Sequence, residues 1–212
     1  MNRSSTYGAS MRPMPRIKRV VDLVLSAIGL IVLAVLFPFI ALALTIESKG
    51  PVIFKARRVG HGGRVFIMYK FRTMVFDAQA LLPNLRDRNL GGPHMIRIPH
   101  DPRVTRVGGW LRRTGLDELP QFLNVLKGEM SVVGPRPQSP DEMALYDGRQ
   151  RRRLEIMPGI TGLWQVTSRQ SPSFNEWVRL DLQYIDSWSV MLDLKILIRT
   201  AILLLSRKAG EI

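Results

Sequence analysis

The sequence predicts a membrane-associated α+β protein, in which an N-terminal membrane helix precedes a cytoplasmic, mainly helical domain with a small sheet. Three observations predict this class. Residues 23–46 carry no charge, residues 52–74 are typical of two short strands around a glycine turn, and the later segments show helical periodicity. The length of 212 residues favours one principal domain.

Composition limits the chemistry of the chain. It contains no cysteine, so disulfides and thiolate metal sites are excluded, and any metal would take oxygen ligands, as magnesium does. The formal net charge of +14 indicates an anionic partner. Composition leaves that partner open among nucleic acid, phospholipid headgroups and a phosphorylated substrate.

The membrane helix is predicted from its length. As a helix, residues 23–46 would extend about 36 Å, enough to cross a hydrocarbon core of about 30 Å. A cleaved signal peptide is disfavoured, because the apolar run is too long and no small-residue cleavage site precedes the "ESKG" that follows it. Residues 1–16, which are polar and basic, are expected to form a disordered tail.

Basic residues flank the membrane helix on both sides, and such residues mark the cytoplasmic side of a membrane. Lys18 and Arg19 precede it, and Lys49 and Lys55 follow it. Pro38 lies past its middle, where a proline removes a helical hydrogen bond and kinks the chain. A helix that breaks at Pro38 and returns to the same face satisfies both flanks, whereas a single-pass helix would merely tolerate the proline. The residues alone leave both topologies open.

The remaining elements are predicted from turn signals and periodicity. The chain is expected to form, in order, a hairpin around Gly60 to Gly63, a short helix over 75–85, a surface loop over 86–110, a helix within 116–128 that Gly128 stops, a helix opened by Ser173 or Pro172, and a helix over 193–210. The last helix is interpreted as amphipathic and interfacial, with a core helix as the alternative.

Two adjacent carboxylates, Asp117 and Glu118, come at the start of the helix that Gly128 stops, with Pro120 in its first turn. Helix neighbours diverge by about 100°, so the two acids can do different work. One can attack a phosphoryl group and form an acyl phosphate, while the other holds a divalent cation. The alternative is that both are ordinary first-turn acids that cap the helix.

Basic residues surround the two acids in the sequence. Arg112 precedes them, and Arg136 follows in a "GPRP" turn, where Pro135 and Pro137 restrict the backbone and hold the guanidinium in place. Lys70 and Arg72 alternate along the "YKFRTM" strand and would share a face. Each can bind phosphate. The alternatives are a structural salt bridge for Arg136 and a solvated face for the strand pair.

Several motifs in order resemble one family. They are "KRVVD", "SKGPVIFKARRVG", "YKFRTM", "DPRVTRVGGWLRRTGLDELPQFLNVLKGEMSVVGPRP", "PGITGLWQV" and "DLQYIDSWSVMLDLKIL". Over residues 17–206 the chain resembles the monotopic phosphoglycosyl transferases, also called bacterial sugar transferases or polyprenyl-phosphate sugar-1-phosphate transferases, in their short form. The resemblance divides the chain into a basic tail (1–16), a re-entrant membrane helix broken at Pro38 (17–48), a cytoplasmic catalytic domain (49–206) and a second tail (207–212).

The resemblance implies a mechanism. Asp117 would attack the β-phosphate of a UDP-sugar, release UMP and carry the phosphosugar until undecaprenyl phosphate, or another polyprenyl phosphate, accepts it. Glu118 would help bind Mg²⁺, the implied cofactor. Arg112 would contact phosphate, the turn of Pro135 and Arg136 would shape the substrate site, and further substrate-binding residues are implied: Lys70, Arg72 and Asp181.

The resemblance also implies a location and partners. Lys18, Arg19 and Asp22 would lie at headgroup level on the bacterial inner membrane, with the catalytic domain on its cytoplasmic face. The product would initiate a surface glycan, such as exopolysaccharide or lipopolysaccharide, and downstream glycosyltransferases would use it. Nucleic acid is not an expected partner, since no nucleic-acid motif appears. The competing hypothesis is a membrane-tethered, non-catalytic module or subunit that binds nucleic acid or lipid.

Overall fold

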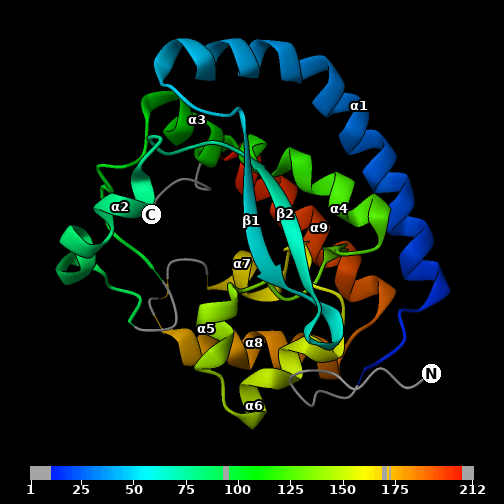
Figure 1. Ribbon diagram of the computed structural model, residues 1–212. Coiled ribbons are helices and arrows are strands. Elements are labelled where there is room, and N and C mark those ends of the chain that lie inside the picture. The colour runs from blue at the N-terminus through cyan, green and yellow to red at the C-terminus, as the bar shows by residue number, and fades with distance from the viewer. Residues whose placement is uncertain (1–10, 93–95, 169–170, 172, 207–212) are drawn as a thin grey trace.

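The computed structural model describes residues 11–92, 96–168, 171 and 173–206. Helix α1 (Arg16–Glu47) follows one edge of the molecule, and Figure 1 shows that its two halves run in different directions. The helix is continuous through Pro38, the proline inside it, and proline is a common cause of such a bend. The predicted break at Pro38 is therefore a bend within one helix.

One stripe of α1 faces the rest of the protein. Its buried residues recur three or four positions apart in each half of the helix: Lys18, Asp22, Ser26 and Gly29, then Ile40 and Leu44. Gly29 has no side chain because the ring of Phe122 occupies the space that a Cβ would need. Large apolar side chains elsewhere on the helix, among them Ile31, Val35 and Phe39, are exposed. Most of α1 thus presents an apolar surface that the protein does not cover.

The predicted hairpin is present. Strands β1 (Ile53–Val59) and β2 (Val65–Phe71) pair antiparallel, with Phe54 opposite Lys70 and Arg58 opposite Phe66. A short helical turn, η1 (His61–Gly63), joins them, and Gly62 and Gly63 have positive φ angles there.

A second sheet was not predicted. Strands β3 (Ser131–Val133) and β4 (Gly159–Thr161) pair in parallel. A Cβ at Gly159 or Gly162 would collide with the backbone of Gly134, so these glycines let the "PGITG" segment lie directly against the "GPRP" turn. These glycines therefore allow two parts of the chain that are distant in sequence to make a close backbone contact.

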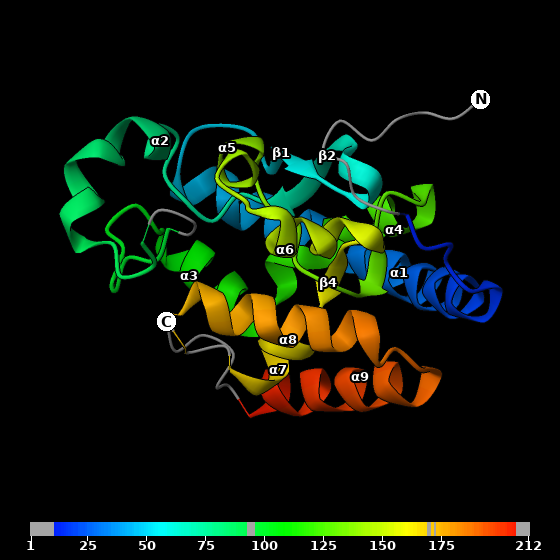
Figure 2. The ribbon, with the colours of Figure 1, turned by 90° about the horizontal axis from the view of Figure 1, so that it is seen from below.

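Most of the remaining chain between β2 and α8 forms short helices. In chain order they are α2 (Ala78–Leu81), η2 (Pro83–Arg88), α3 (Arg106–Thr114), η3 (Leu116–Gln121), α4 (Phe122–Lys127), α5 (Pro140–Ala144), α6 (Gly148–Arg151), η4 (Arg152–Glu155) and α7 (Leu163–Thr167). The long helices α8 (Phe174–Asp186) and α9 (Val190–Leu205) follow. Figure 2 shows α8 and α9 on the opposite side of the molecule from the hairpin.

The main core lies between these layers. Trp164 of α7 stacks on Trp177 of α8 with ring centroids 3.9 Å apart, and Tyr184, Met130 and Val125 are buried in the same cluster. Because α7 contacts both α8 and α9, it joins the two helices to the core.

Two terminal predictions meet the structure differently. Residues 1–10 and 207–212 of the predicted tails lie outside the described residues. Arg12, within the predicted tail, forms an ion pair with Glu155 at 3.0 Å and donates to the carbonyl of Ile185, so this part of the tail packs on the domain. At the other end, α9 buries Asp193 and Ile196 and exposes most of its apolar residues, which disfavours the core-helix alternative; its place in a membrane interface stays a prediction.

Candidate active site

The adjacent acids stand at a junction between two short helices. Gly115 ends α3 in the left-handed conformation, with φ of 71°, and η3 begins at the next residue with Asp117 and Glu118 in its first turn. Pro120 lies within η3, which continues directly into α4. The predicted placement at a helix start is confirmed, although this first turn is a 3₁₀ helix. Element η3 packs against β2, which brings Lys70 to the acids.

Glu118 is held by two cations. Its Oε1 accepts from Lys70 Nζ at 2.7 Å and from Arg136 Nη1 at 3.0 Å, and the three residues come from η3, β2 and the turn after β3. Lys70 Nζ is also 3.8 Å from Asp117 Oδ2. The fold thus gathers four of the predicted residues, separated by up to 66 positions in the sequence, around one carboxylate pair.

The two acids have opposite electrostatic environments. Burial raises the pKa of Asp117, and the attraction of Lys70 only partly offsets it. Burial acts on Glu118 in the same direction, but Lys70 and Arg136 outweigh it and hold its pKa well below the usual range. Asp117 accepts no hydrogen bond within the described part of the chain, so its oxygens are free to react. Glu118 is a fixed negative charge, whereas Asp117 is a less solvated and more basic carboxylate.

Arg112 is a third cation whose charge acts on Asp117. It extends from the last turn of α3, where its Nε donates to Thr73 Oγ1 at 2.9 Å, and its charge acts on Asp117. Burial lowers the pKa of the Arg112 guanidinium. Asp117 therefore faces Arg112, Lys70 and Arg136, a set of cations suited to a phosphoryl group.

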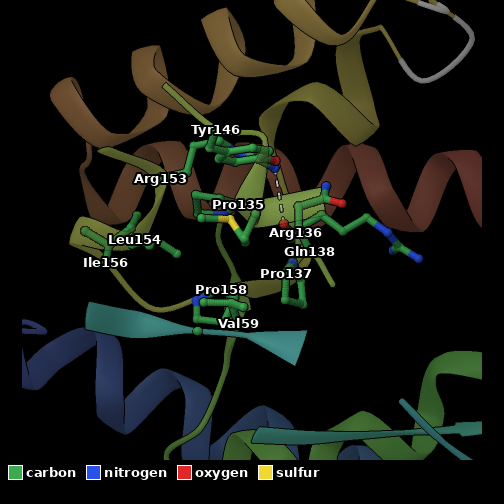
Figure 3. A pocket seen from close by; sticks show the side chains of 12 residues that line it. Val59, Pro135, Arg136, Pro137, Gln138, Tyr146, Arg153, Leu154, Ile156 and Pro158 are labelled. Atoms are coloured by element: carbon green, nitrogen blue, oxygen red, sulfur yellow. Dashed lines mark hydrogen bonds between the residues drawn. The ribbon is translucent and has the colours of Figure 1, made fainter. Parts of the chain in front are cut away.

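The "GPRP" turn is supported from behind. Arg153 donates through Nη2 to the carbonyl of Arg136 at 3.1 Å, and it also binds Tyr146 and, at 2.8 Å, Asp181. Figure 3 shows this support beside Pro135 and Pro137, with the Arg136 side chain extending away from the cavity that these residues line. The cavity measures about 10 Å³, room for one water at most. The turn therefore rests on a filled, rigid base.

Two predicted substrate-binding residues lie elsewhere. Arg72 is buried at the end of α1, where it donates to the carbonyls of Leu44, Ser48 and Lys49 at 2.8–2.9 Å. Asp181 is 1% exposed and forms an ion pair with Arg153. Burial raises the pKa of Asp181 to about 6, because it outweighs the attraction of Arg153. In this structure Arg72 binds the end of α1, and Asp181 supports the turn through Arg153; a contact of either side chain with substrate stays a prediction.

The predicted headgroup residues attach α1 to the domain. Lys18 forms an ion pair with Asp193 at 2.7 Å, and Arg19 donates to the carbonyls of Val125 and Leu126 at the end of α4. Asp22 accepts from Ser131 Oγ at 3.0 Å and from the Val132 amide at 2.9 Å. The three polar side chains thus bind groups of the domain, and their predicted place at headgroup level stays a prediction.

Sequence reasoning missed the support residues Arg153 and Tyr146. Arg153 is the last of three consecutive arginines, so its sequence context did not separate it from Arg151 and Arg152. A usable signal was Asp181, which falls on the apolar stripe of α8 among Trp177, Val178 and Ile185. A carboxylate on such a stripe indicates a buried cationic partner.

The donor set fits a magnesium ion only in one way. Among the described residues, no three carboxylate or imidazole groups gather to bind a metal. Glu118 Oε2, however, accepts no hydrogen bond from the described residues, and its carboxylate stays ionised. Magnesium commonly binds one or two carboxylates and completes its shell with water and substrate phosphates. The site suits that arrangement, with Glu118 as the ligand.

Comparison with known proteins gives consistent matches. The pattern of the family described as "Bacterial sugar transferase" matches residues 14–207. The chain is 44% identical over 184 residues to galactosyl transferase CpsE of Streptococcus agalactiae, covering 86% of this chain and 41% of that protein. It is 39% identical to the exopolysaccharide production protein ExoY of Sinorhizobium fredii, covering 90% of this chain and 87% of that protein.

A further relative carries a more specific name. The undecaprenyl-phosphate galactose phosphotransferase of Salmonella typhimurium is 39% identical over 195 residues, which cover 90% of this chain and 41% of that protein. The chain therefore spans less than half the length of CpsE and of the Salmonella protein, and most of the length of ExoY.

Proposed function

The chain belongs to the bacterial sugar transferase family, and on that premise we propose that it transfers a sugar-1-phosphate from a UDP-sugar to polyprenyl phosphate. The products are UMP and a polyprenyl-diphospho-sugar, and the reaction passes through a phosphosugar ester on Asp117. The product is the first lipid-linked intermediate of a surface glycan such as an exopolysaccharide. The observation that carries the proposal is the unequal pair of acids, one free and basic, the other fixed by two cations.

In the first step, an oxygen of Asp117 attacks the β-phosphorus of the donor. The new bond forms an acyl phosphate, and the bond from this phosphorus to the bridging oxygen breaks, so UMP leaves with the electron pair. Asp117 suits this role because its carboxylate is largely buried and accepts no hydrogen bond from the described residues. Lys70, Arg112 and Arg136 supply positive charge for the phosphoryl oxygens.

In the second step, the phosphate of the polyprenyl carrier attacks the same phosphorus. The bond to Asp117 breaks, which restores the carboxylate and releases the polyprenyl-diphospho-sugar. Since the two anionic substrates react in turn, the same cations serve both. Glu118 would hold the proposed Mg²⁺, which when bound would neutralise diphosphate charge.

We also propose that α1 enters the membrane from the cytoplasmic face and returns to it. The helix is long and apolar enough to cross a membrane, and only 17% of its most apolar 18-residue stretch is buried. Its two ends, however, are both fixed to the same domain: Lys18 binds Asp193 near the start, and Arg72 binds carbonyls at the end. A straight helix of 32 residues would extend about 48 Å and place its ends on opposite sides. The bend and the shared attachments favour a re-entrant helix.

The test is single-turnover release of UMP. Purified protein in detergent with Mg²⁺, and without lipid acceptor, is mixed with each member of a panel of UDP-sugars. We expect a burst of about one UMP per enzyme with the cognate donor, which identifies the sugar. Asp117→Asn abolishes the burst, and chelation of Mg²⁺ suppresses it.

Two other outcomes would contradict the proposal. Turnover only after polyprenyl phosphate is added, with no burst before, would indicate direct transfer and remove Asp117 as the nucleophile. Absence of UMP release from every UDP-sugar tested, with and without acceptor, would favour a non-catalytic membrane-tethered module.

A further inference from the structure

A third arginine stands beside the site without a partner. Arg58 lies on β1 opposite Phe66, and Phe54 of the same strand lies opposite Lys70. Residues four apart on one strand share a face, and opposite residues in an antiparallel pair share a face. Arg58 therefore projects from the same face of the hairpin as Lys70, while its neighbour Arg57 is exposed on the other face.

The hairpin places Arg58 next to the "GPRP" turn. The amide of Val59 donates to the carbonyl of Gln138 at 2.8 Å, and this bridge attaches the end of β1 to the residue that follows Pro137. Figure 3 shows Val59, Arg136 and Gln138 around the same small cavity. The position of Arg58 relative to Arg136 is thus set by backbone hydrogen bonds on both sides of β1.

The Arg58 side chain is half-buried and lacks a hydrogen-bond partner. Its Nε is closed off from solvent and finds no acceptor among the described residues. Burial lowers its pKa, and the charges that act on it are Glu142, which attracts it, and Arg136, which repels it. Ser139 donates through its amide and its hydroxyl to Oε2 of Glu142, and the described residues show no hydrogen bond or ion pair between Glu142 and Arg58. A partly desolvated guanidinium beside a second one is costly unless an anion joins them.

Arg58 lies four residues along β1, about 13 Å of extended strand, from the position opposite Lys70, whose Nζ is 3.8 Å from Asp117 Oδ2. The charged groups that act on Asp117 are Lys70, Glu118, Arg112 and Arg136, and Arg58 is not among the main ones. Arg136 donates to Glu118, and its charge also acts on Arg58, so it links the acids electrostatically to Arg58. An anion bound by Arg58 is therefore one group removed from the phosphorus that Asp117 attacks.

We propose that Arg58 binds the phosphate of the leaving nucleoside monophosphate, and this inference rests on the function proposed above. When the bond to the β-phosphorus breaks, its electron pair stays on the bridging oxygen, which then belongs to UMP. Negative charge develops on that phosphate. A guanidinium can donate two parallel hydrogen bonds to it, which stabilises the charge as it forms.

The experiment compares two adjacent arginines. Binding of UMP to the full chain in detergent is measured by calorimetry for the wild type, Arg58→Ala and the matched control Arg57→Ala. We expect Arg58→Ala to weaken UMP binding about tenfold or more, and Arg57→Ala to leave it unchanged. Single-turnover UMP release should slow for Arg58→Ala at saturating donor, because the lost contact strengthens as the bond breaks.

The outcomes separate the two proposals. Equal UMP affinity of the two alanine variants, with an active wild type, would overturn the role of Arg58 and leave the transferase proposal standing. A wild type that neither binds UMP nor releases it from any UDP-sugar would overturn both. If Arg58→Ala does not fold, judged by its thermal unfolding, Arg58→Gln and Arg58→Lys are measured by the same criterion.

Discussion

The buried ion pair between Lys18 and Asp193 allows a direct test of how the membrane helix is attached. Lys18 Nζ contacts Asp193 Oδ2 at 2.7 Å, the Val133 carbonyl at 2.9 Å and the Tyr184 hydroxyl at 3.1 Å. Asp193 also accepts from Tyr184 at 2.6 Å and from Trp188 at 3.1 Å. The perturbations are Lys18→Met, Asp193→Asn and the double variant.

The expected magnitudes follow from burial. The Lys18 and Asp193 side chains are 8% and 12% exposed, so removal of either partner leaves an uncompensated charge away from water. Each single substitution should lower the free energy of unfolding by about 3–5 kcal/mol. The double variant leaves no such charge, so its loss should be close to that of one single variant. The coupling energy should therefore reach about 2 kcal/mol or more.

The assay is urea unfolding of detergent-solubilised protein, followed by far-ultraviolet circular dichroism. The control cycle uses Arg152→Met and Asp186→Asn, an ion pair whose side chains are 36% and 52% exposed and whose coupling should stay below about 1 kcal/mol. Additive losses at Lys18 and Asp193, equal within error to the sum of the singles, would refute the reasoning and show that the two charges act independently.

Three further predictions concern the site and its support. Single-turnover UMP release should have a bell-shaped pH dependence. The rate should rise as Asp117 ionises, through a pKa that burial raises, and fall as Lys70 loses its proton, through a pKa that burial lowers. Lys70→Arg should move the alkaline limb to higher pH, and a wild-type rate that stays flat to alkaline pH would contradict the role of Lys70. Arg72→Lys should lower the free energy of unfolding by about 2–4 kcal/mol in the same assay, because a single ammonium cannot reproduce the contacts to three carbonyls. It should leave UMP affinity unchanged, with Arg57→Lys as the matched control. Weakened UMP binding in Arg72→Lys would instead support a substrate contact. Gly159→Ala should cost about 1–3 kcal/mol because its Cβ meets the Gly134 backbone, whereas Gly148→Ala, with nothing near its Cβ, should cost nothing measurable; equal thermal unfolding of the two variants would show that the two segments can separate.

The sequence predicted the parts of the fold that local signals specify. The hairpin has alternating residues and a glycine turn, and the start of α8 has Ser173, whose hydroxyl accepts from the Glu176 amide as an N-cap does. The β3–β4 pair has no such signal. Each strand is three residues long, and their pairing depends on the absence of side chains at Gly159 and Gly162. Contact between distant glycines is a tertiary property that a local pattern does not contain.

The site was predicted in part, for the same reason. Lys70 and Arg72 are alternate cations on one strand, and nothing in "YKFRTM" distinguishes them. Their partners do: Lys70 faces the acids of η3, whereas Arg72 faces the last turn of α1. Arg58 went unmarked because "KARRVG" offers two arginines, and only the pairing register shows which one turns inward.

The short spacing between Lys70 and Arg72 fixes the distance between the acids and the end of α1. Arg72 donates to carbonyls at the end of the helix that is proposed to enter the lipid, and Lys70 donates to the carboxylate of Glu118 beside the proposed nucleophile. Two extended residues span about 7 Å, roughly the thickness of a headgroup layer. Under the proposed function, a polyprenyl carrier whose phosphate lies at that height would reach Asp117 while its isoprenoid chain stays in the hydrocarbon. Insertion or deletion of residues between positions 70 and 72 would change that height, so we expect the spacing to tolerate far less variation than the loop over 86–105.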